Sequence, residues 1–172
     1  MSAITFENVS RTPRAGVKGP GAAAWLAGLG VPVPATSNSW LPLPGGLIAR
    51  LGLTEFLVEG SESTKLTAPR APGVYPVLRQ DTALVLKGAR LNELLLETCS
   101  VDFRALNPAL RPVVLTSLAG VGVTVITGEE GGMPCCRIWC DSTYGEWFYE
   151  TLTGVAGELT QSSPSRHQGV TP

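Results

Sequence analysis

The sequence has little charge, a single histidine and no long hydrophobic run. Only 16% of its 172 residues are charged, against about 25% in a typical soluble domain, so about 16 charges are missing by that standard. The 13 basic and 14 acidic residues nearly cancel, which argues against a nucleic-acid-binding protein, because phosphate binding normally needs a basic excess. A surface this poor in charge predicts that another chain covers part of it.

The hydrophobic pattern also excludes a membrane span. No apolar stretch reaches the roughly 20 residues that a membrane-spanning helix needs. The N-terminal sequence MSAITFENVSR lacks the basic and then apolar pattern of a secretion signal. We therefore expect a cytoplasmic protein whose four cysteines are reduced thiols.

The scarcity of histidine limits what the cysteines can do. Cys135, Cys136 and Cys140 form a cluster without CxxC spacing, Cys99 stands apart, and the only histidine, His167, lies in the polar tail. Structural zinc needs four ligands, usually CxxC pairs or cysteines with histidines, and a nucleophilic thiol needs a positioned base. Strand alternation places Cys136 and Cys140 on one face and Cys135 on the other. We expect ordinary buried thiols and no metal.

The glycine-rich stretches lack the spacings that bind nucleotides. Neither residues 18–21 nor residues 128–132 contain GxGxxG or GxxxxGK[ST]. The first stretch is interpreted as a strand-to-helix turn and the second as a hairpin loop. Lys18 and Lys87, each just before a predicted helix, could hold an anion, although a solvated lysine is the simpler interpretation.

No catalytic constellation is evident among the remaining polar and aromatic residues. The carboxylates expected inside ordered elements lack a neighbouring histidine or lysine that would suggest acid–base chemistry; they are Glu55, Glu59, Asp81, Asp102, Asp141 and Glu146. The aromatic cluster is interpreted as core and interface; it comprises Trp139, Tyr144, Trp147, Phe148 and Tyr149. A helix cannot bury the neighbours Trp147 and Phe148 equally in one core, so we expect one of them to meet a partner. We predict no catalytic, cofactor-binding or metal-binding residue in this chain.

The predicted elements occur in the same order twice. Lys18-Gly19 and Lys87-Gly88 each stand before a short apolar helix. Hydrophobic periodicity predicts helices over 22–27 and 91–97 and strands over 47–52, 54–59, 82–86, 113–118 and 121–126. In the strand over 54–59, Phe56 and Val58 alternate with Glu55, Leu57 and Glu59, which predicts a half-buried strand. We predict an α+β fold in which duplicated strand–helix–strand–strand units, over 17–59 and 82–126, form one compact domain on a mixed sheet.

The rest of the chain is assigned around these units. Residues 1–16 are predicted as a lead-in segment, and the single domain spans 17–160. The proline-rich stretch 31–46 is predicted as an irregular loop with extended stretches, and 60–76 as an exposed connection. A further strand over 137–140 precedes a last helix, whose capping-box spacing begins at Thr143 and whose predicted apolar face is Trp147, Phe148, Thr151 and Leu152. The tail 161–172 is predicted to be disordered.

Several motifs resemble one known family. They are VKGPGAAAWL, the stretch Gly52 to Leu57, the turn and helix from Leu86 to Leu95, the segment Cys99 to Asp102, and Ser142 to Trp147. Over roughly residues 15–155 the sequence resembles the gamma subunit of heterotetrameric sarcosine oxidase. That subunit is related to the glycine-cleavage T protein and the folate-dependent aminomethyltransferases. Ser100 and Val101 depart from the usual proline and leucine of the family.

The resemblance implies an aminomethyltransferase-like folate-binding fold and a place in a larger complex. Such a complex oxidatively demethylates sarcosine or a related N-methylated amine and transfers the one-carbon unit to tetrahydrofolate. By the same resemblance, larger alpha and beta subunits and a small delta subunit hold FAD, FMN, NAD, zinc and tetrahydrofolate. This chain would be a non-catalytic subunit without a cofactor of its own. A stand-alone folate-binding or one-carbon-transfer protein of the same fold remains the alternative, and the sequence does not choose among N-methylated substrates.

The low charge also predicts that the isolated chain exposes apolar surface. We expect contiguous exposed apolar patches, to which Trp40 and either Trp139 or Trp147 contribute. Without its larger partners, such a chain is expected to aggregate.

Overall fold

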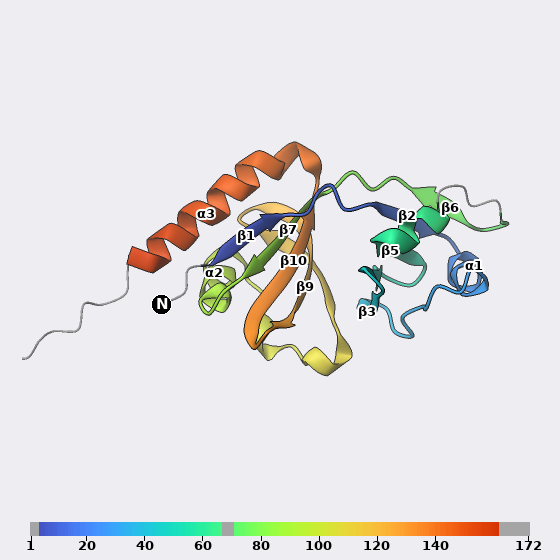
Figure 1. The fold of residues 1–172 in the computed structure, drawn as a ribbon, viewed down its shortest axis with the longest axis horizontal. Helices are drawn as coiled ribbons and strands as arrows, with labels where there is room; N and C mark the ends of the chain where they lie inside the picture. The colour runs from blue at the N-terminus through green and yellow to red at the C-terminus, as the bar shows by residue number, and fades with distance from the viewer. Residues whose placement is uncertain (1–3, 67–70, 162–172) are drawn as a thin grey trace, which may run out of the picture.

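The computed structural model describes residues 4–66 and 71–161. Two five-stranded sheets face each other near the middle of the molecule, and helices lie on their outer sides (Figure 1). Within these residues every pair of neighbouring strands is antiparallel, so the predicted mixed sheet is wrong.

The first sheet has the strand order β3-β4-β5-β2-β6. Its elements are β2 (Arg14–Lys18), α1 (Ala22–Gly28), β3 (Ser39–Leu43), β4 (Gly46–Arg50), β5 (Glu55–Glu59), the 3-10 helix η1 (Ser61–Leu66) and β6 (Tyr75–Val77). Leu26 of α1 packs with Val17 and Phe56 in the outer core of this sheet. A tight turn joins β4 to β5, and across it Leu51 N donates to the carbonyl of Glu55 at 2.8 Å.

The second sheet has the strand order β1-β7-β10-β9-β8. Its elements are β1 (Thr5–Asn8), β7 (Thr82–Lys87), α2 (Leu91–Thr98), β8 (Val113–Leu118), β9 (Val121–Glu130), β10 (Met133–Cys140) and α3 (Gly145–Gln161), with 3-10 turns η2 (Phe103–Ala105), η3 (Pro108–Leu110) and η4 (Ser142–Tyr144). Leu94 of α2 and Phe148 of α3 pack against Leu86 and Ile138 on its outer face.

The inner faces of the two sheets share a third core. Leu57 and Ala49 of the first sheet pack with Ile126 and Trp139 of the second. Strand β5 is therefore covered on both faces, so the expectation of a half-buried strand over 54–59 is wrong. Alternation along β5 did reveal two faces, but the face opposite Phe56 meets another sheet rather than water.

The structure confirms the duplication and corrects its alignment. The order β6-β2-β5-β4-β3 corresponds strand for strand to β1-β7-β10-β9-β8. We expected residues 47–59 to match 113–126, but β4 and β5 correspond to β9 and β10, one strand later. The error came from β3, which lies inside the stretch 31–46 that we expected to be a loop. Its residue Pro42 is tolerated because β3 is an edge strand.

The two copies meet at equivalent edges. Trp40 N donates to the carbonyl of Arg111 at 3.0 Å, and Val113 N donates to the carbonyl of Asn38 at 2.8 Å. Asn38 and Arg111, which stand just before β3 and β8, both adopt positive φ angles of 54° and 46°. The reciprocal bonds place a pseudo-twofold axis between these edges, beside the bridge from Ser39 to Pro112.

The copies also exchange their fifth strands. Strand β1, which leads into β2, pairs with β7 of the second sheet, and β6, which leads into β7, pairs with β2 of the first. Two connections, residues 9–13 and 78–81, therefore run between the sheets, as Figure 1 shows in blue and green.

The predicted borders of the domain can be compared with these elements. The lead-in 1–16 contains β1 and the first residues of β2, and the connection 60–76 contains η1 and part of β6. Residues 67–70 and most of the predicted tail 161–172 lie outside the described residues; Gln161 is the last residue of α3.

Candidate functional site

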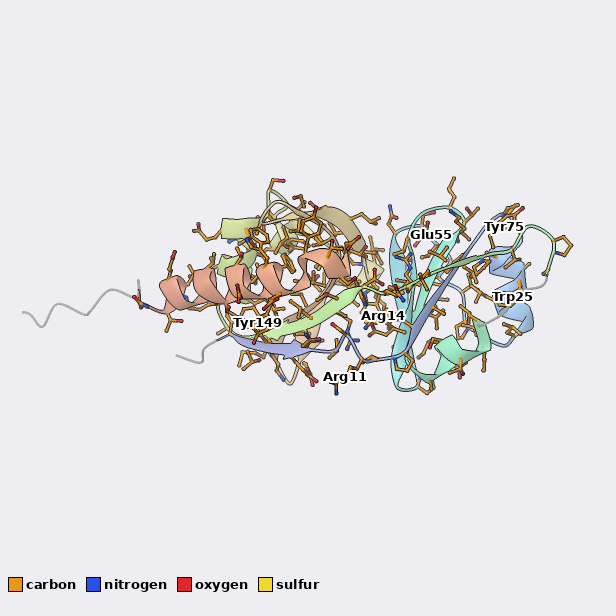
Figure 2. All side chains as sticks on the ribbon, turned by 90° about the horizontal axis from the view of Figure 1, so that it is seen from above. Arg11, Arg14, Trp25, Glu55, Tyr75 and Tyr149 are labelled. Carbon is orange, nitrogen blue, oxygen red and sulfur yellow. The ribbon has the colours of Figure 1, made fainter. Side chains whose placement is uncertain are left out.

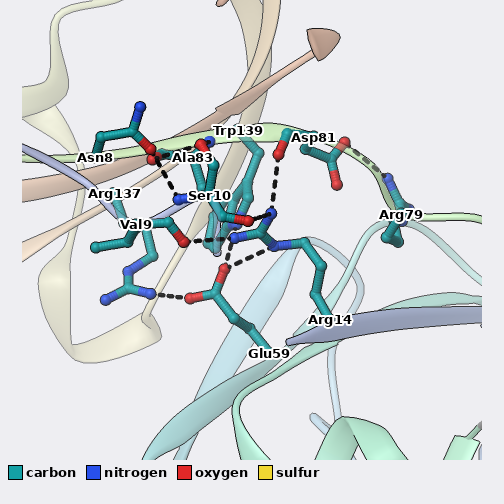
Figure 3. Close-up of polar contacts among 10 residues, drawn as sticks. All are labelled: Asn8, Val9, Ser10, Arg14, Glu59, Arg79, Asp81, Ala83, Arg137 and Trp139. Carbon is teal, nitrogen blue, oxygen red and sulfur yellow. Dashed lines mark hydrogen bonds and ion pairs between the residues drawn. The ribbon is translucent and has the colours of Figure 1, made fainter. Parts of the chain in front are cut away.

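A charged cluster lies buried between the two sheets, centred on the carboxylate of Glu59 (Figure 3). Arg14 Nε donates to Glu59 Oε2 at 3.1 Å, and Trp139 Nε1 donates to the same oxygen at 2.7 Å. Arg137 donates to Oε1. The Glu59 side chain has no solvent exposure, and burying an unpaired carboxylate would cost several kcal/mol, so these three donors are what make its burial possible.

Arg14 also fastens the two connections between the sheets. Its side chain, 3% exposed, donates to the carbonyl oxygens of Val9 at 2.9 Å, Ser10 at 3.3 Å and Asp81 at 2.9 Å. Figure 2 shows Arg14 at the junction of the two halves. Burial lowers the pKa of Arg14, partly offset by the charge of Asp81, but a guanidinium still stays charged near neutral pH.

The duplication explains where this cluster sits. The register pairs Arg14 with Glu59 in the first sheet and Ala83 with Trp139 in the second. Glu59 and Trp139 therefore occupy equivalent positions and touch across the pseudo-twofold axis. The contact between these two residues was not expected from the sequence, because strand alternation predicts a solvent-facing position for Glu59. Both carboxylate oxygens of Glu59 accept hydrogen bonds, from Arg14 of the first sheet and from Arg137 and Trp139 of the second, so the cluster joins the two sheets.

A groove lies beside Trp40, between the edge strand β3 and the loop after α2. Its volume is about 570 Å³, and Leu95, Phe103 and Arg104 are among the residues that line it. Trp40 Nε1 is buried without a hydrogen-bond partner, and the guanidinium of Arg111 lies 5.8 Å from the centre of the Trp40 ring. The volume suits a small molecule, and the indole N–H could donate to an acceptor on it.

The cysteines occupy the faces that strand alternation predicts. Cys136 and Cys140 lie in the outer core of the second sheet, while Cys135 lines the Trp40 groove on the other face. Burial raises the pKa of all three thiols, that of Cys140 to about 11, which disfavours the thiolate nucleophile. Cys99 Sγ lies 3.6 Å from Thr116 Oγ1. Across residues 4–66 and 71–161, no group of three or more metal-ligating side chains comes together.

The lysines considered for anion binding stand apart from each other. Lys18 is exposed, and Lys87 Nζ lies 3.6 Å from Glu130 on the neighbouring hairpin. They occupy equivalent positions of the two copies, opposite Glu55 and Cys135 in the registers. The structure does not bring them to one site.

The other candidate carboxylates have local partners or face solvent. Glu55 pairs with Arg79 at 2.6 Å, and Arg79 also approaches Asp81 at 4.0 Å. Hydrogen bonds from Arg104 lower the pKa of Asp102. The backbone N–H and hydroxyl of Thr143 likewise lower the pKa of Asp141, which caps η4. These contacts stabilise turns, and Glu146 is exposed near the start of α3.

The aromatic cluster separates into buried and exposed members. Phe148 is fully buried whereas Trp147 is 51% exposed, so the prediction that a helix cannot bury both is confirmed. The predicted apolar face of α3 is wrong at Trp147, because the buried residues are Gly145, Phe148, Leu152 and Ala156. Trp139, expected as a possible surface residue, is buried, since it belongs to the core between the sheets.

Tyr149 and Tyr144 are the remaining members of the aromatic cluster. The Tyr149 ring stands edge-on to Phe6 of β1 at 5.9 Å, and Figure 2 shows Tyr149 on the side of α3 nearest β1. Tyr144 is 53% exposed just before the helix.

Among the described helices, α3 included, none has the length and hydropathy to cross a membrane.

Comparisons with known proteins address the fold. No protein-family model matches the sequence, and no curated protein matches it. The chain is similar in structure to a chain of heterotetrameric sarcosine oxidase from Corynebacterium sp. U-96 in complex with pyrrole 2-carboxylate, with a TM-score of 0.74 and 22% identity over 94% of this chain and 88% of that chain.

It is also similar to glycine cleavage system aminomethyltransferase T from Bartonella henselae, with a TM-score of 0.67 and 13% identity over 89% of this chain and 46% of that one. The chain thus spans about half the length of that enzyme. These are the two groups of proteins that the sequence motifs resemble. The chain has the aminomethyltransferase-like α+β fold predicted from its sequence.

Proposed function

We propose that this chain is a non-catalytic subunit of a flavin-dependent complex that oxidatively demethylates sarcosine or a related N-methylated amine. In this proposal the complex passes the one-carbon unit to tetrahydrofolate. FAD, FMN, NAD, zinc and tetrahydrofolate lie in the other chains, which are larger alpha and beta subunits and a small delta subunit.

One observation carries the proposal. The structural match covers 94% of this chain and 88% of a chain that belongs to a heterotetramer, whereas it covers 46% of the aminomethyltransferase. The similarity to the sarcosine oxidase chain thus extends over nearly all of both chains. A subunit of the same kind is the simplest function for a chain built in this way.

The distribution of polar groups supports a role without catalysis. The carboxylate of Glu59 is fully buried and accepts hydrogen bonds from three side chains. Cys140, whose pKa is raised to about 11, is a poor nucleophile. By contrast, Trp147 exposes 51% of its surface. Trp is enriched among the residues that anchor protein interfaces.

The decisive experiment is purification of the complex from native cells. A tagged chain expressed from its own locus is expected to co-purify with larger, flavin-containing chains that oxidise sarcosine or another N-methylated amine. Removal of the chain is expected to lower the amount of assembled complex. A tagged chain that elutes at its own mass without flavin would contradict the proposal.

The Trp40 groove favours one alternative, a stand-alone folate-binding protein. The unpartnered Trp40 Nε1 and the nearby Arg111 could hold a flat anionic ligand. Calorimetry with tetrahydrofolate and the isolated chain tests this function. Binding that is lost in Trp40→Phe, which keeps a ring but removes the N–H, would support it; no heat of binding would rule it out.

A further inference from the structure

Helix α3 carries an outer face that nothing in the described chain covers. Trp147, Glu150, Gly154 and Gly157 are all exposed and recur at spacings of three and four residues, so they form one stripe opposite the buried Phe148. Figure 2 shows α3 on the surface with no other element in front of it. We refer to these four residues as the outer face of α3.

The two glycines of this face have no explanation within the chain. Glycine weakens a helix interior relative to alanine. A Cβ added at Gly145 would collide with Thr82, which explains that glycine, but a Cβ at Gly154 or Gly157 would meet nothing within 4 Å. Small residues on an exposed helix face would let the backbone of another helix approach closely.

The charge of this region indicates what kind of surface approaches. Residues 138–165 contain no lysine or arginine, and Glu146 and Glu150 are exposed on α3. Near the end of α3, Arg90 donates to the carbonyl of Leu159, and its guanidinium pairs with Glu93 at 2.5 Å. Two copies packed through this face would oppose like charges, so a second copy of the chain is a poor occupant.

We propose that the outer face of α3 is the docking site for a helix of a larger subunit, one with an apolar stripe flanked by lysine or arginine. Trp147 is its anchor, and Gly154 and Gly157 allow the close approach. The assignment rests on the proposed function, since it names the surface through which this chain joins its complex.

A competition experiment in cells tests the assignment without isolating the partner. Wild-type and variant chains with different tags are co-expressed, the flavin-containing assembly is purified by size, and mass spectrometry gives the ratio of the two chains in it. Trp147→Ala is expected to lower incorporation about 30-fold, the equivalent of about 2 kcal/mol for an anchor residue.

Gly154→Leu separates docking from folding. Because leucine favours helix and the position is open, the thermal midpoint of the dilute variant chain is expected to stay the same or rise, while its incorporation falls at least 10-fold. The matched control is Gly28→Leu in α1, a helical position where an added Cβ also meets nothing within 4 Å. Its incorporation is expected to equal that of wild type.

The charge argument has its own variant pair. Glu150→Lys is expected to lower incorporation roughly 10-fold in low salt and less in high salt, because exposed charges are screened. Glu129→Lys, an exposed residue of the β9–β10 hairpin, reverses the same charge far from α3 and is expected to have no effect.

The outcomes distinguish the two proposals. Equal incorporation of wild type and Gly154→Leu into a flavin-containing assembly would overturn the docking assignment and leave the proposed function intact. A homodimer of this chain that Gly154→Leu dissociates would overturn it as well, because a second copy would then occupy the face. A wild-type chain found in no larger assembly would overturn both proposals.

Discussion

Replacing Glu59 by alanine removes the carboxylate that joins the two sheets. Arg14 would keep its bonds to the carbonyls of Val9, Ser10 and Asp81 but lose its counter-ion while remaining 3% exposed. Trp139 Nε1 would lose its acceptor in a buried position. The Arg137 side chain is 28% exposed, so water can replace part of what it loses.

The size of the effect follows from these partners. Breaking a buried ion pair by removing one member costs about 3–5 kcal/mol, and an unsatisfied buried donor costs about 1–3 kcal/mol. Because Arg14 and Trp139 share one oxygen of Glu59, the two costs overlap and do not add. We expect Glu59→Ala to lower the free energy of unfolding by about 4 kcal/mol, much of the 5–15 kcal/mol of a typical domain.

Urea unfolding of the chain at submicromolar concentration, followed by tryptophan fluorescence, measures this free energy. The control is Glu55→Ala on the same strand, where the pair with Arg79 involves a carboxylate that is 38% exposed; we expect a loss below about 1 kcal/mol. A loss for Glu59→Ala no larger than this control would refute the reasoning. Replacing Glu59 and Arg14 together by Leu and Met is expected to recover most of the stability, because no uncompensated charge then remains.

Four further predictions concern other parts of the molecule. Changing Cys135, Cys136 and Cys140 to serine is expected to cost about 1–3 kcal/mol in urea unfolding and to leave turnover of the assembled complex near wild type. Folding raises the pKa of Cys140 to about 11, so the thiol of the unfolded chain loses its proton at a lower pH than that of the folded chain. The stability that comes from the neutral, buried thiol is therefore complete below the ordinary thiol pKa and is lost as pH rises toward about 11. In unfolding curves measured at rising pH, Cys140→Ala should flatten that decline. Gly46→Ala is expected to prevent folding, judged by circular dichroism, because its Cβ would collide with the carbonyl of Glu59, whereas Gly122→Ala meets nothing within 4 Å and should fold. At the high concentrations reached during expression, well above those of the urea experiment, the chain without its partners is expected to aggregate and to be rescued by co-expression with them, and Trp147→Asp should block that rescue; a stable monomer on size exclusion at such concentrations would contradict this.

The repeat could be recognised from the sequence because its two Lys-Gly pairs mark the same strand-to-helix turn in both copies. Ala22 N donates to the carbonyl of Gly19, and Leu91 N donates to the carbonyl of Gly88, at 3.0 and 3.1 Å. Both copies thus use the same turn between strand and helix. At Gly19 the φ angle of 116° and the nearness of Gly73 leave no space for a side chain, so the glycine that marked the repeat is a physical necessity.

The strand pairing between the two copies could not be predicted from the sequence, because no local residue pattern specifies it. Strands β1 and β6 have four and three residues, too few to show alternation, and each pairs with the sheet of the other copy. Glu59 illustrates the same limit. Alternation assigned it correctly to the face opposite Phe56, but only the second sheet, packed against that face, turns a carboxylate expected in water into the centre of a buried cluster.

The duplication is least complete at the ends of the two copies. Strand β5 is followed by the six-residue 3-10 helix η1, whereas the equivalent β10 is followed through η4 by the 17-residue α3. The first copy buries Leu66 at this place, and the second buries Phe148, Leu152 and Ala156. A symmetric molecule would offer two equivalent helix faces to its surroundings, but this one offers a single long helix. In the docking that we propose, a partner that binds α3 meets a single helix, so it binds one chain in one orientation. The divergence of the two copies thus gives the otherwise symmetric fold one distinct helical face.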